Sequence, residues 1–143
     1  MKKYFNCKVS FEKTLENGQP KRISESYIVD ALSFTEAEAR IVKEIQPYVT
    51  GEFEIVSVNR CNIAEIIRGA GESWYRCKIN CLVIDEARGI EKYAPIVLFI
   101  QSINFDEAYN KCKDYCNNSL NDLEIENVSL SKIIDIFEYG NNL

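Results

Sequence analysis

The sequence predicts an α+β fold, a tandem duplication of a β-β-α-β unit that forms one pseudo-two-fold sheet with two helices packed on one face. Three observations lead to this prediction. The two halves of the chain match each other, each half contains strand-like segments that end in turn residues, and each half has one helix with a recognisable N-terminal cap. We expect about six strands in the sheet.

The internal match is colinear along both halves of the chain. Three pairs of blocks coincide at a shift of 70 or 71 residues: YFNCKV with WYRCKI, SFTEA with NFDEA, and FEI with LEI. Such a series predicts a duplicated unit. We expect a first repeat over residues 1–68, a glycine-containing linker over residues 69–72 and a second repeat over residues 73–143, which together form one compact domain.

Each half opens with two predicted strands, which cover residues 4–13 and 23–32 in the first half and 74–85 and 93–103 in the second. These segments are rich in aromatic and β-branched residues, which favour strands. The first pair is joined by a turn that contains Asn17-Gly18, a dipeptide typical of tight hairpins.

A helix follows the two strands in each half. Ser33 precedes Glu36 by three residues, and Asn104 precedes Glu107 by three, which is the spacing of a capping box. In the first half an apolar stripe predicts one buried helix face, which consists of Phe34, Ala37, Ile41, Ile45 and Tyr48. A third strand and a short apolar tail then close each half. The tails, residues 62–67 and 132–137, could be a strand or a helical turn.

The composition is typical of a soluble globular protein. The chain has 143 residues, and no apolar run approaches the roughly 20 residues that a membrane-crossing helix needs. The start MKKYFNC lacks the apolar region of a signal peptide. We therefore expect a cytoplasmic location, free thiols and no membrane partner.

The charges and the missing histidine limit the function. The net charge is −5: residues 1–70 carry ten basic and ten acidic side chains, and residues 71–143 carry seven basic and twelve acidic ones. This balance does not attract phosphate backbones, although a local basic strip could still bind nucleic acid. The chain contains no histidine and no nucleophile or phosphate-loop motif. We therefore expect a protein that is not an enzyme and needs no cofactor.

Two cysteine pairs raise the question of a metal or redox site. Cys77 and Cys81 share one face of a predicted strand, and Cys112 and Cys116 share one face of a predicted helix, so four thiolates could meet at a zinc ion. The repeat favours core packing instead, because three of these cysteines replace large apolar residues of the first half. Those counterparts are Phe11, Ile41 and Ile45. Reduced cysteine behaves as a small apolar side chain in such places.

The aromatic pair that opens each half suggests a binding surface. Neighbouring strand residues point to opposite faces, so we expect one ring of each pair in the core and the other exposed. Exposed rings beside basic side chains suit single-stranded nucleic acid. A second basic surface is the first hairpin, which also carries Lys13. The candidate ligand-binding residues are Trp74, Arg76, Lys78, Tyr4, Lys8, Lys21 and Arg22.

Four stretches carry a resemblance to a known family: YIVDALSFTEAEARIV, GEFEIVSV, NIAEII and WYRCKINCLVIDEARGIEKY. They resemble an uncharacterised family of unknown function from Bacteroidales and their crAss-like phages, and the resemblance covers nearly the whole chain. This sequence departs from the family in its many cysteines and in its FEYGNNL end. The resemblance implies a bacterial or phage protein, in the host cytoplasm if a phage encodes it. It implies no activity and no catalytic residue.

We therefore expect a non-enzymatic binding module of the phage or bacterial cytoplasm. The basic and aromatic residues favour a role in nucleic-acid transactions, with single-stranded nucleic acid as the partner. One alternative is an inhibitor or scaffold that binds a host protein and uses the acidic second half as a mimic of a charged polymer. Another is the sequestration of a small nucleotide, in a groove between the halves or across a homodimer.

Overall fold

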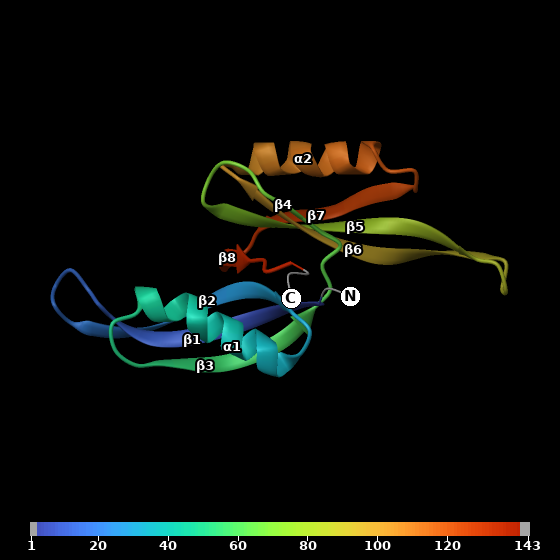
Figure 1. Cartoon of the computed structure of the whole chain (residues 1–143). Helices are drawn as coiled ribbons and strands as arrows, with labels where there is room; N and C mark the ends of the chain where they lie inside the picture. Colours follow the sequence, from blue (N-terminus) through green and yellow to red (C-terminus); the bar gives the residue numbers. More distant parts are fainter. Residues whose placement is uncertain (1–2, 141–143) are drawn as a thin grey trace. The chain divides into compact units, whose positions relative to one another are not determined.

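The computed structural model describes residues 3–140, so the first two residues and the last three of the FEYGNNL end lie outside the described residues. The chain divides into two compact units. One consists of Met1–Asn62 and Lys132–Leu143, and the other of Ile63–Ser131. Each unit has one four-stranded sheet and one α-helix (Figure 1). The α+β class is confirmed, whereas the expectation of one sheet shared by both halves is wrong.

The first unit has the strand order β3-β1-β2-β8. The long strands β1 and β2 form a hairpin whose turn contains Gly18 at φ 82°, as the Asn17-Gly18 dipeptide predicts. Strand β3 is antiparallel to β1, and β8 is parallel to β2. The elements of this unit are β1 (Lys3–Thr14), β2 (Pro20–Ala31), α1 (Phe34–Ile45), the 3₁₀ helix η1 (Gln46–Tyr48), β3 (Phe53–Cys61) and β8 (Ile133–Phe137).

The second unit has the corresponding order β4-β6-β5-β7. Strands β5 and β6 form its hairpin, β7 is antiparallel to β5, and β4 is parallel to β6. The elements are β4 (Glu65–Ile67), β5 (Ser73–Asp85), β6 (Ile90–Ser102), α2 (Phe105–Asn117) and β7 (Leu123–Leu130). None of the helices within residues 3–140 is long and apolar enough to cross a membrane.

The two short tails are strands, and each one completes the sheet of the other half. Strand β4 follows the first-half β3, yet it lies beside β6, with Ile66 opposite Phe99. Strand β8 follows β7, yet it lies beside β2, with Ile136 opposite Ile28. A single shared sheet does not form because each tail strand pairs with the outer edge of a hairpin, and that edge is then not available to the other hairpin. The units consequently divide after Asn62 and after Ser131, outside the expected linker at residues 69–72.

Both predicted helix caps are present. The Ser33 side chain accepts a hydrogen bond from the Glu36 amide at 3.1 Å, and Asn104 accepts one from Glu107 at 2.9 Å. The predicted buried stripe of α1 holds only in part. Its middle residues are buried, whereas Tyr48 is 82% exposed. The reason is that α1 ends at Ile45 and the chain continues as a 3₁₀ helix, whose different pitch turns Tyr48 away from the stripe.

Phe34, at the other end of the predicted stripe, is also exposed, although its ring packs edge-on against Phe5 at 5.0 Å. The core of the first unit lies between α1 and one face of its sheet. It consists of Phe5, Cys7, Val9, Tyr27, Val29, Ala31, Ala37, Ile41 and Ile45. The corresponding core under α2 consists of Tyr75, Cys77, Ile79, Leu98, Ile100, Ala108 and Cys112.

Candidate functional site

The predicted residues of β5 alternate between the two faces of the second sheet. Tyr75 belongs to the core under α2, so Trp74, Arg76 and Lys78 lie on the opposite face. Arg76 is exposed, and Lys78 forms an ion pair with Glu126 at 3.2 Å. These three residues therefore share one face, as strand alternation predicts.

Trp74 is enclosed rather than exposed. Its relative exposure is 1%, the Arg68 guanidinium lies 5.5 Å from the centre of its ring, and its carbonyl accepts a hydrogen bond from the Ser131 hydroxyl at 2.7 Å. The expectation that one ring of each aromatic pair is exposed is therefore wrong for this pair, since Tyr75 is buried as well. A base could not stack on the Trp74 ring in this conformation.

The predicted residues of the first unit lie on its sheet and hairpin. Tyr4 is half-buried, and its hydroxyl donates to Glu138 at 3.4 Å. Lys8 and Lys21 are exposed. Arg22 is exposed too, but its guanidinium donates to the Ser10 hydroxyl at 3.0 Å and to Glu54 at 3.4 Å. Basic side chains are thus available on this unit, although the Arg22 charge is partly compensated.

The four cysteines of the second unit lie mainly in its interior. Cys77, Cys81 and Cys112 are buried, Cys116 is half-buried, and all are free thiols. The hydrogen bond that Cys112 donates to Cys77, followed by burial, raises the pKa of Cys112, and the same hydrogen bond lowers the pKa of Cys77. Burial raises the pKa of Cys116 to about 11. Protonated thiols such as those of Cys112 and Cys116 are poor nucleophiles and poor metal ligands. Within residues 3–140, no group of three or more Cys, Asp or Glu side chains is placed to hold a metal ion.

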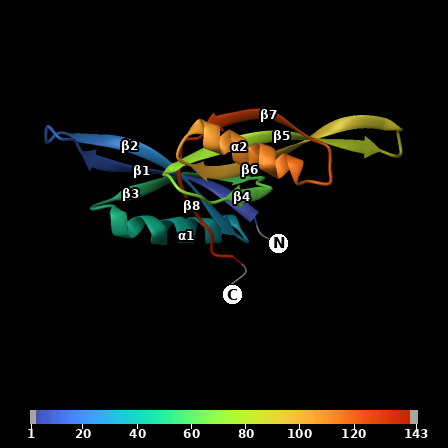
Figure 2. The same ribbon diagram turned by 90° about the horizontal axis from the view of Figure 1, so that it is seen from above.

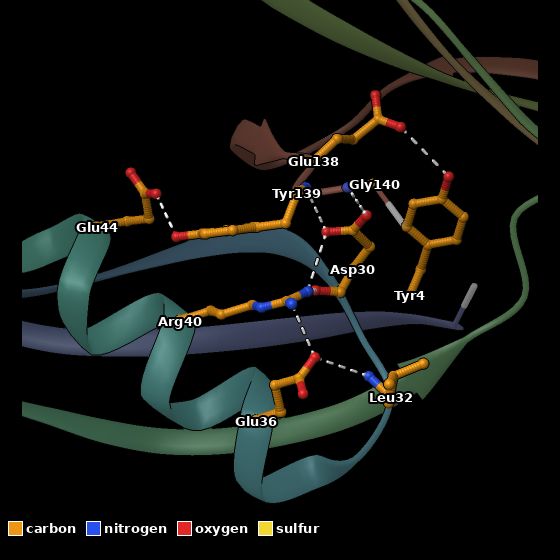
Figure 3. A network of polar contacts seen from close by, with 9 residues as sticks. All are labelled: Tyr4, Asp30, Leu32, Glu36, Arg40, Glu44, Glu138, Tyr139 and Gly140. Atoms are coloured by element: carbon orange, nitrogen blue, oxygen red, sulfur yellow. Dashed lines mark hydrogen bonds and ion pairs between the residues drawn. The ribbon is translucent and has the colours of Figure 1, made fainter. Parts of the chain in front are cut away.

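A buried carboxylate that the sequence analysis missed lies at the end of β2. The Asp30 side chain is 1% exposed and accepts hydrogen bonds from the backbone amides of Tyr139 at 2.7 Å and of Gly140 at 2.9 Å (Figure 3). The Arg40 guanidinium lies 3.5 Å from the same carboxylate. The signal for this residue was a single charge inside the apolar run YIVDAL.

Arg40 connects this carboxylate to helix α1. Its guanidinium donates to the Asp30 carbonyl, pairs with Glu36 at 2.9 Å and lies 4.4 Å from the centre of the Tyr139 ring (Figure 3). The Tyr139 hydroxyl in turn donates to Glu44. The network therefore attaches the segment that follows β8 to both the sheet and the helix. Each charged side chain of the network interacts with another of its members.

The second unit has a corresponding arrangement in which a neutral glutamine takes the place of the buried carboxylate. Gln101 holds the place of Asp30: its side chain accepts from the Gly69 amide at 3.3 Å and donates to the Gly71 carbonyl at 3.2 Å. Lys111 holds the place of Arg40, donating to the Gln101 carbonyl at 3.1 Å and pairing with Glu107 at 3.0 Å. In each unit the network fastens the segment that follows the parallel edge strand. The network therefore holds this segment against the sheet and the helix of its unit.

The β5–β6 hairpin extends beyond the rest of its sheet, and we call residues 82–93 the arm. Strand β7 pairs with β5 only as far as Cys81, and β4 pairs with β6 only at Leu98–Ile100. The arm is consequently a two-stranded ribbon, which runs past the end of β7 in Figure 2. Its base is fastened by a hydrogen bond from the Leu82 amide to the Asp122 carbonyl at 3.0 Å.

The arm exposes large apolar side chains to solvent. Ile84 is 67% and Tyr93 59% exposed, and because Leu82 is directly opposite Tyr93, these three residues lie on one face. Ile90, on the other face, is exposed as well. Hydrogen bonds close the turn at the tip: the Asp85 carbonyl accepts from the Gly89 amide at 2.7 Å, and the Asp85 carboxylate accepts from the Ala87 amide at 3.1 Å.

Comparison with known proteins identifies a family but no characterised relative. A family model described as a domain of unknown function (DUF4494) matches residues 3–139. No curated protein and no solved structure matches the chain. The expectation of a family without an assigned function is confirmed.

Proposed function

This chain belongs to the family described as a domain of unknown function (DUF4494), and we propose that it is a non-enzymatic binding module that docks on another protein through the arm. The observation that carries this proposal is the exposure of Ile84 and Tyr93 on a ribbon that pairs with no third strand within residues 3–140. An isolated hairpin gains little stability in water, and exposed apolar clusters on soluble proteins commonly mark interaction sites. The proposal follows the inhibitor-or-scaffold alternative of the sequence analysis.

The charges of the arm indicate what the partner surface looks like. Residues 82–93 contain three acidic side chains (Asp85, Glu86 and Glu91) and two basic ones (Arg88 and Lys92), a net charge of −1. The apolar face of the arm would therefore fit an apolar groove with basic residues at its border. Tyr93 is the expected anchor, because tyrosine combines a large apolar ring with a polar hydroxyl.

Site-specific photo-crosslinking in the native host tests this proposal. A photoreactive phenylalanine analogue at position 93 should trap one protein of defined mass, whereas the same analogue at the exposed Ile103, on the same unit but outside the arm, should not. Ile84→Asp should weaken the interaction by about tenfold or more. The variant should stay folded, with a free energy of unfolding within about 0.5 kcal/mol of the parent. Equal trapping at both positions, or none at position 93, would contradict the proposal.

Nucleic-acid binding is a second candidate, favoured by one feature of the first hairpin. Lys13 and Lys21 are direct cross-strand neighbours, and both are exposed. Like charges in this arrangement repel each other, so an anionic partner would stabilise the pair. Oligonucleotide binding at about 50 mM salt that weakens steeply at higher salt, and is lost with Lys13→Ala/Lys21→Ala, would support this candidate. No binding at low salt would exclude it.

We also propose an evolutionary origin for the chain and a location in the cell. We propose that the chain arose by tandem duplication. Asp30 and Gln101 fasten corresponding segments, and each has a basic partner at the corresponding helix position, Arg40 in one unit and Lys111 in the other. Circular dichroism and crosslinking on separately expressed halves would show whether the two halves need each other's tail strands.

The resemblance to Bacteroidales and phage proteins supports a cytoplasmic site of action, which fractionation of the native host tests.

A further inference from the structure

The first unit contains a cavity of about 430 Å³ beside the end of helix α1. The β1–β2 hairpin extends past the C-terminal end of α1 (Figure 1), and the cavity lies between this part of the hairpin, which includes Thr14, and the end of the helix at Ile45. Phe11 and Tyr27 from the hairpin and Ile45 and Tyr48 from the helical side line the space. This volume lies within the usual range of small-molecule sites, about 300–1,000 Å³.

The inner end of the cavity is negative. Glu25 lies opposite Val9 and Tyr27 opposite Cys7, and since Val9 and Cys7 belong to the core under α1, both side chains are on the helix-facing side of the hairpin. The Tyr27 hydroxyl donates to Glu25 Oε2 at 2.5 Å. The other oxygen, Oε1, makes no hydrogen bond within the part of the chain that the structure describes. A carboxylate oxygen is therefore available to a ligand.

Two further features increase this preference for positive charge. Burial, and then the hydrogen bond to Glu25, raise the pKa of Tyr27, so its hydroxyl remains a neutral donor. The last turn of α1, which ends at the lining residue Ile45, presents the negative end of the helix dipole. Both effects favour a cation at the inner end over a phosphate or a carboxylate.

Aromatic rings complete the cavity. Phe11, Tyr27 and Tyr48 all line it, and Tyr48 is the most exposed of the three. Aromatic faces attract cations, and a carboxylate with several rings is the composition of known ammonium-binding cages. Tyr48 is exposed because of the 3₁₀ turn after Ile45, so the fold places a large ring at the rim without burying it.

The fold itself does not require a carboxylate and a tyrosine hydroxyl at the positions of Glu25 and Tyr27. In the second unit Ile96 lies opposite Ile79, as Glu25 lies opposite Val9 in the first. Leu98 likewise lies opposite Cys77, as Tyr27 lies opposite Cys7. Apolar residues thus occupy the two corresponding positions under α2 in the second unit. The Glu25–Tyr27 pair is a feature of one unit only, which is expected of a ligand site rather than of a structural necessity.

We propose that this cavity binds a small organic amine, whose ammonium group pairs with Glu25 and whose apolar stem lies over Phe11. Lys13 lines the outer end and makes no ion pair within the described residues. Lys13 is four residues from Val9, the partner of Glu25, so the two charged groups are based about 13 Å apart along the hairpin. A carboxylate at the far end of the stem therefore strengthens binding. The site is in the other unit from the arm, and the inference is independent of the proposed function.

Four six-carbon probes test the proposal by nuclear magnetic resonance titration of the full-length, isotope-labelled chain: hexylamine, 6-aminohexanoate, hexanoate and hexanol. Hexylamine should give saturable shifts at Val49 and Thr50, which line the cavity, with a Kd of about 1 mM or tighter. The amino acid 6-aminohexanoate should bind more tightly than hexylamine, by about threefold. The anion and the neutral alcohol should not bind measurably.

Matched variants assign the contacts. Glu25→Gln keeps an acceptor for the Tyr27 hydroxyl but removes the charge, and should weaken hexylamine binding by about tenfold. Glu38→Gln removes the same charge from an exposed position on α1 and should have no effect. Tyr48→Ala should weaken binding by about threefold. Lys13→Ala should remove the advantage of 6-aminohexanoate over hexylamine.

Several outcomes would overturn the proposal. Equal binding of hexanol and hexylamine would show a merely apolar cavity, and tighter binding of hexanoate would reverse the assigned charge preference. Shifts that map outside the cavity, or no saturable shift at about 20 mM hexylamine, would remove the site. If Glu25→Gln fails to fold, the exposed variants Tyr48→Ala and Lys13→Ala still decide, because neither replaces a buried side chain.

Discussion

The carboxylate of Asp30 accepts a hydrogen bond from the backbone amide of Tyr139 at 2.7 Å, across 109 residues of sequence. The charge is buried, and Arg40 compensates it from the helix side while its guanidinium covers the Tyr139 ring. A buried charge that is paired and hydrogen-bonded in this way holds its neighbours in one geometry, and removing one partner is costly. This contact thus fastens the C-terminal segment to the first unit.

Replacement of Asp30 should therefore destabilise the protein strongly. Asp30→Ala leaves two amides and the Arg40 guanidinium without their acceptor, so we expect a loss of about 3 kcal/mol in the free energy of unfolding. Asp30→Asn keeps one acceptor oxygen and should lose less. Urea denaturation measures both values, with Glu38→Gln as the control for removal of an exposed charge. A change below about 0.5 kcal/mol for Asp30→Ala, the size typical of surface positions, would refute the structural role.

Gly71 should not tolerate a side chain. Its φ is +100°, and a Cβ atom there would lie 2.6 Å from the carbonyl carbon of Ser102. We expect Gly71→Ala to cost more than about 2 kcal/mol, from the strained backbone and the clash together. Gly89→Ala is the matched control, since Gly89 also has a positive φ, +65°, but open space around it. Thermal unfolding should show a clearly larger decrease in Tm for Gly71→Ala than for Gly89→Ala.

The pairing of β8 with β2 predicts unequal losses of stability at two isoleucines of β8. Ile136 is 2% exposed and lies opposite Ile28, whereas Ile134 is 49% exposed. Ile136→Ala should cost about 3 kcal/mol, and Ile134→Ala less than about 1 kcal/mol. Urea denaturation of both variants checks this difference. Equal, small costs would show that β8 is not held in this sheet.

Stability should fall above pH 9. Burial raises the pKa of Cys7 to about 12 and that of Cys61 to about 11, from 9.0 for a free thiol. The folded state keeps these protons longer than the unfolded state, so the stabilisation is complete below pH 9 and is lost as the pH rises through the folded pKa. Between pH 7.5 and 10, Cys7 alone should account for about 1 kcal/mol of the loss.

Urea denaturation at both pH values tests the linkage, with Cys7→Ala as the informative variant. This substitution lowers stability at both pH values because it leaves a small cavity, but it should reduce the difference between them. Tyr27 and Tyr139, whose pKa values are also raised, contribute in the same direction and remain in both proteins. An unchanged pH difference would show that the Cys7 thiol does not titrate in this range.

Local patterns predicted the elements well and their assembly only in part. The capping residues Ser33 and Asn104 determine where the helices begin, because a cap acts within one turn of the chain. The cysteines were recognised as core residues because the repeat compares them with isoleucine and phenylalanine. The exposure of Trp74 was mispredicted, since strand alternation gives the face of a side chain and not what covers that face.

The sequence by itself determined the class, the hairpins, the helix caps and the positions of the strands, since each depends on residues close together in the chain. Only the tertiary structure decided that each tail strand pairs with the hairpin of the other half, and that Asp30 receives the amides after β8. A short apolar tail has the same period-two pattern whichever edge it joins. The choice of edge depends on contacts between segments far apart in sequence, which no local pattern contains. The arm and the cavity also depend on this choice of edge, because each lies where a hairpin extends past the strands or the helix beside it.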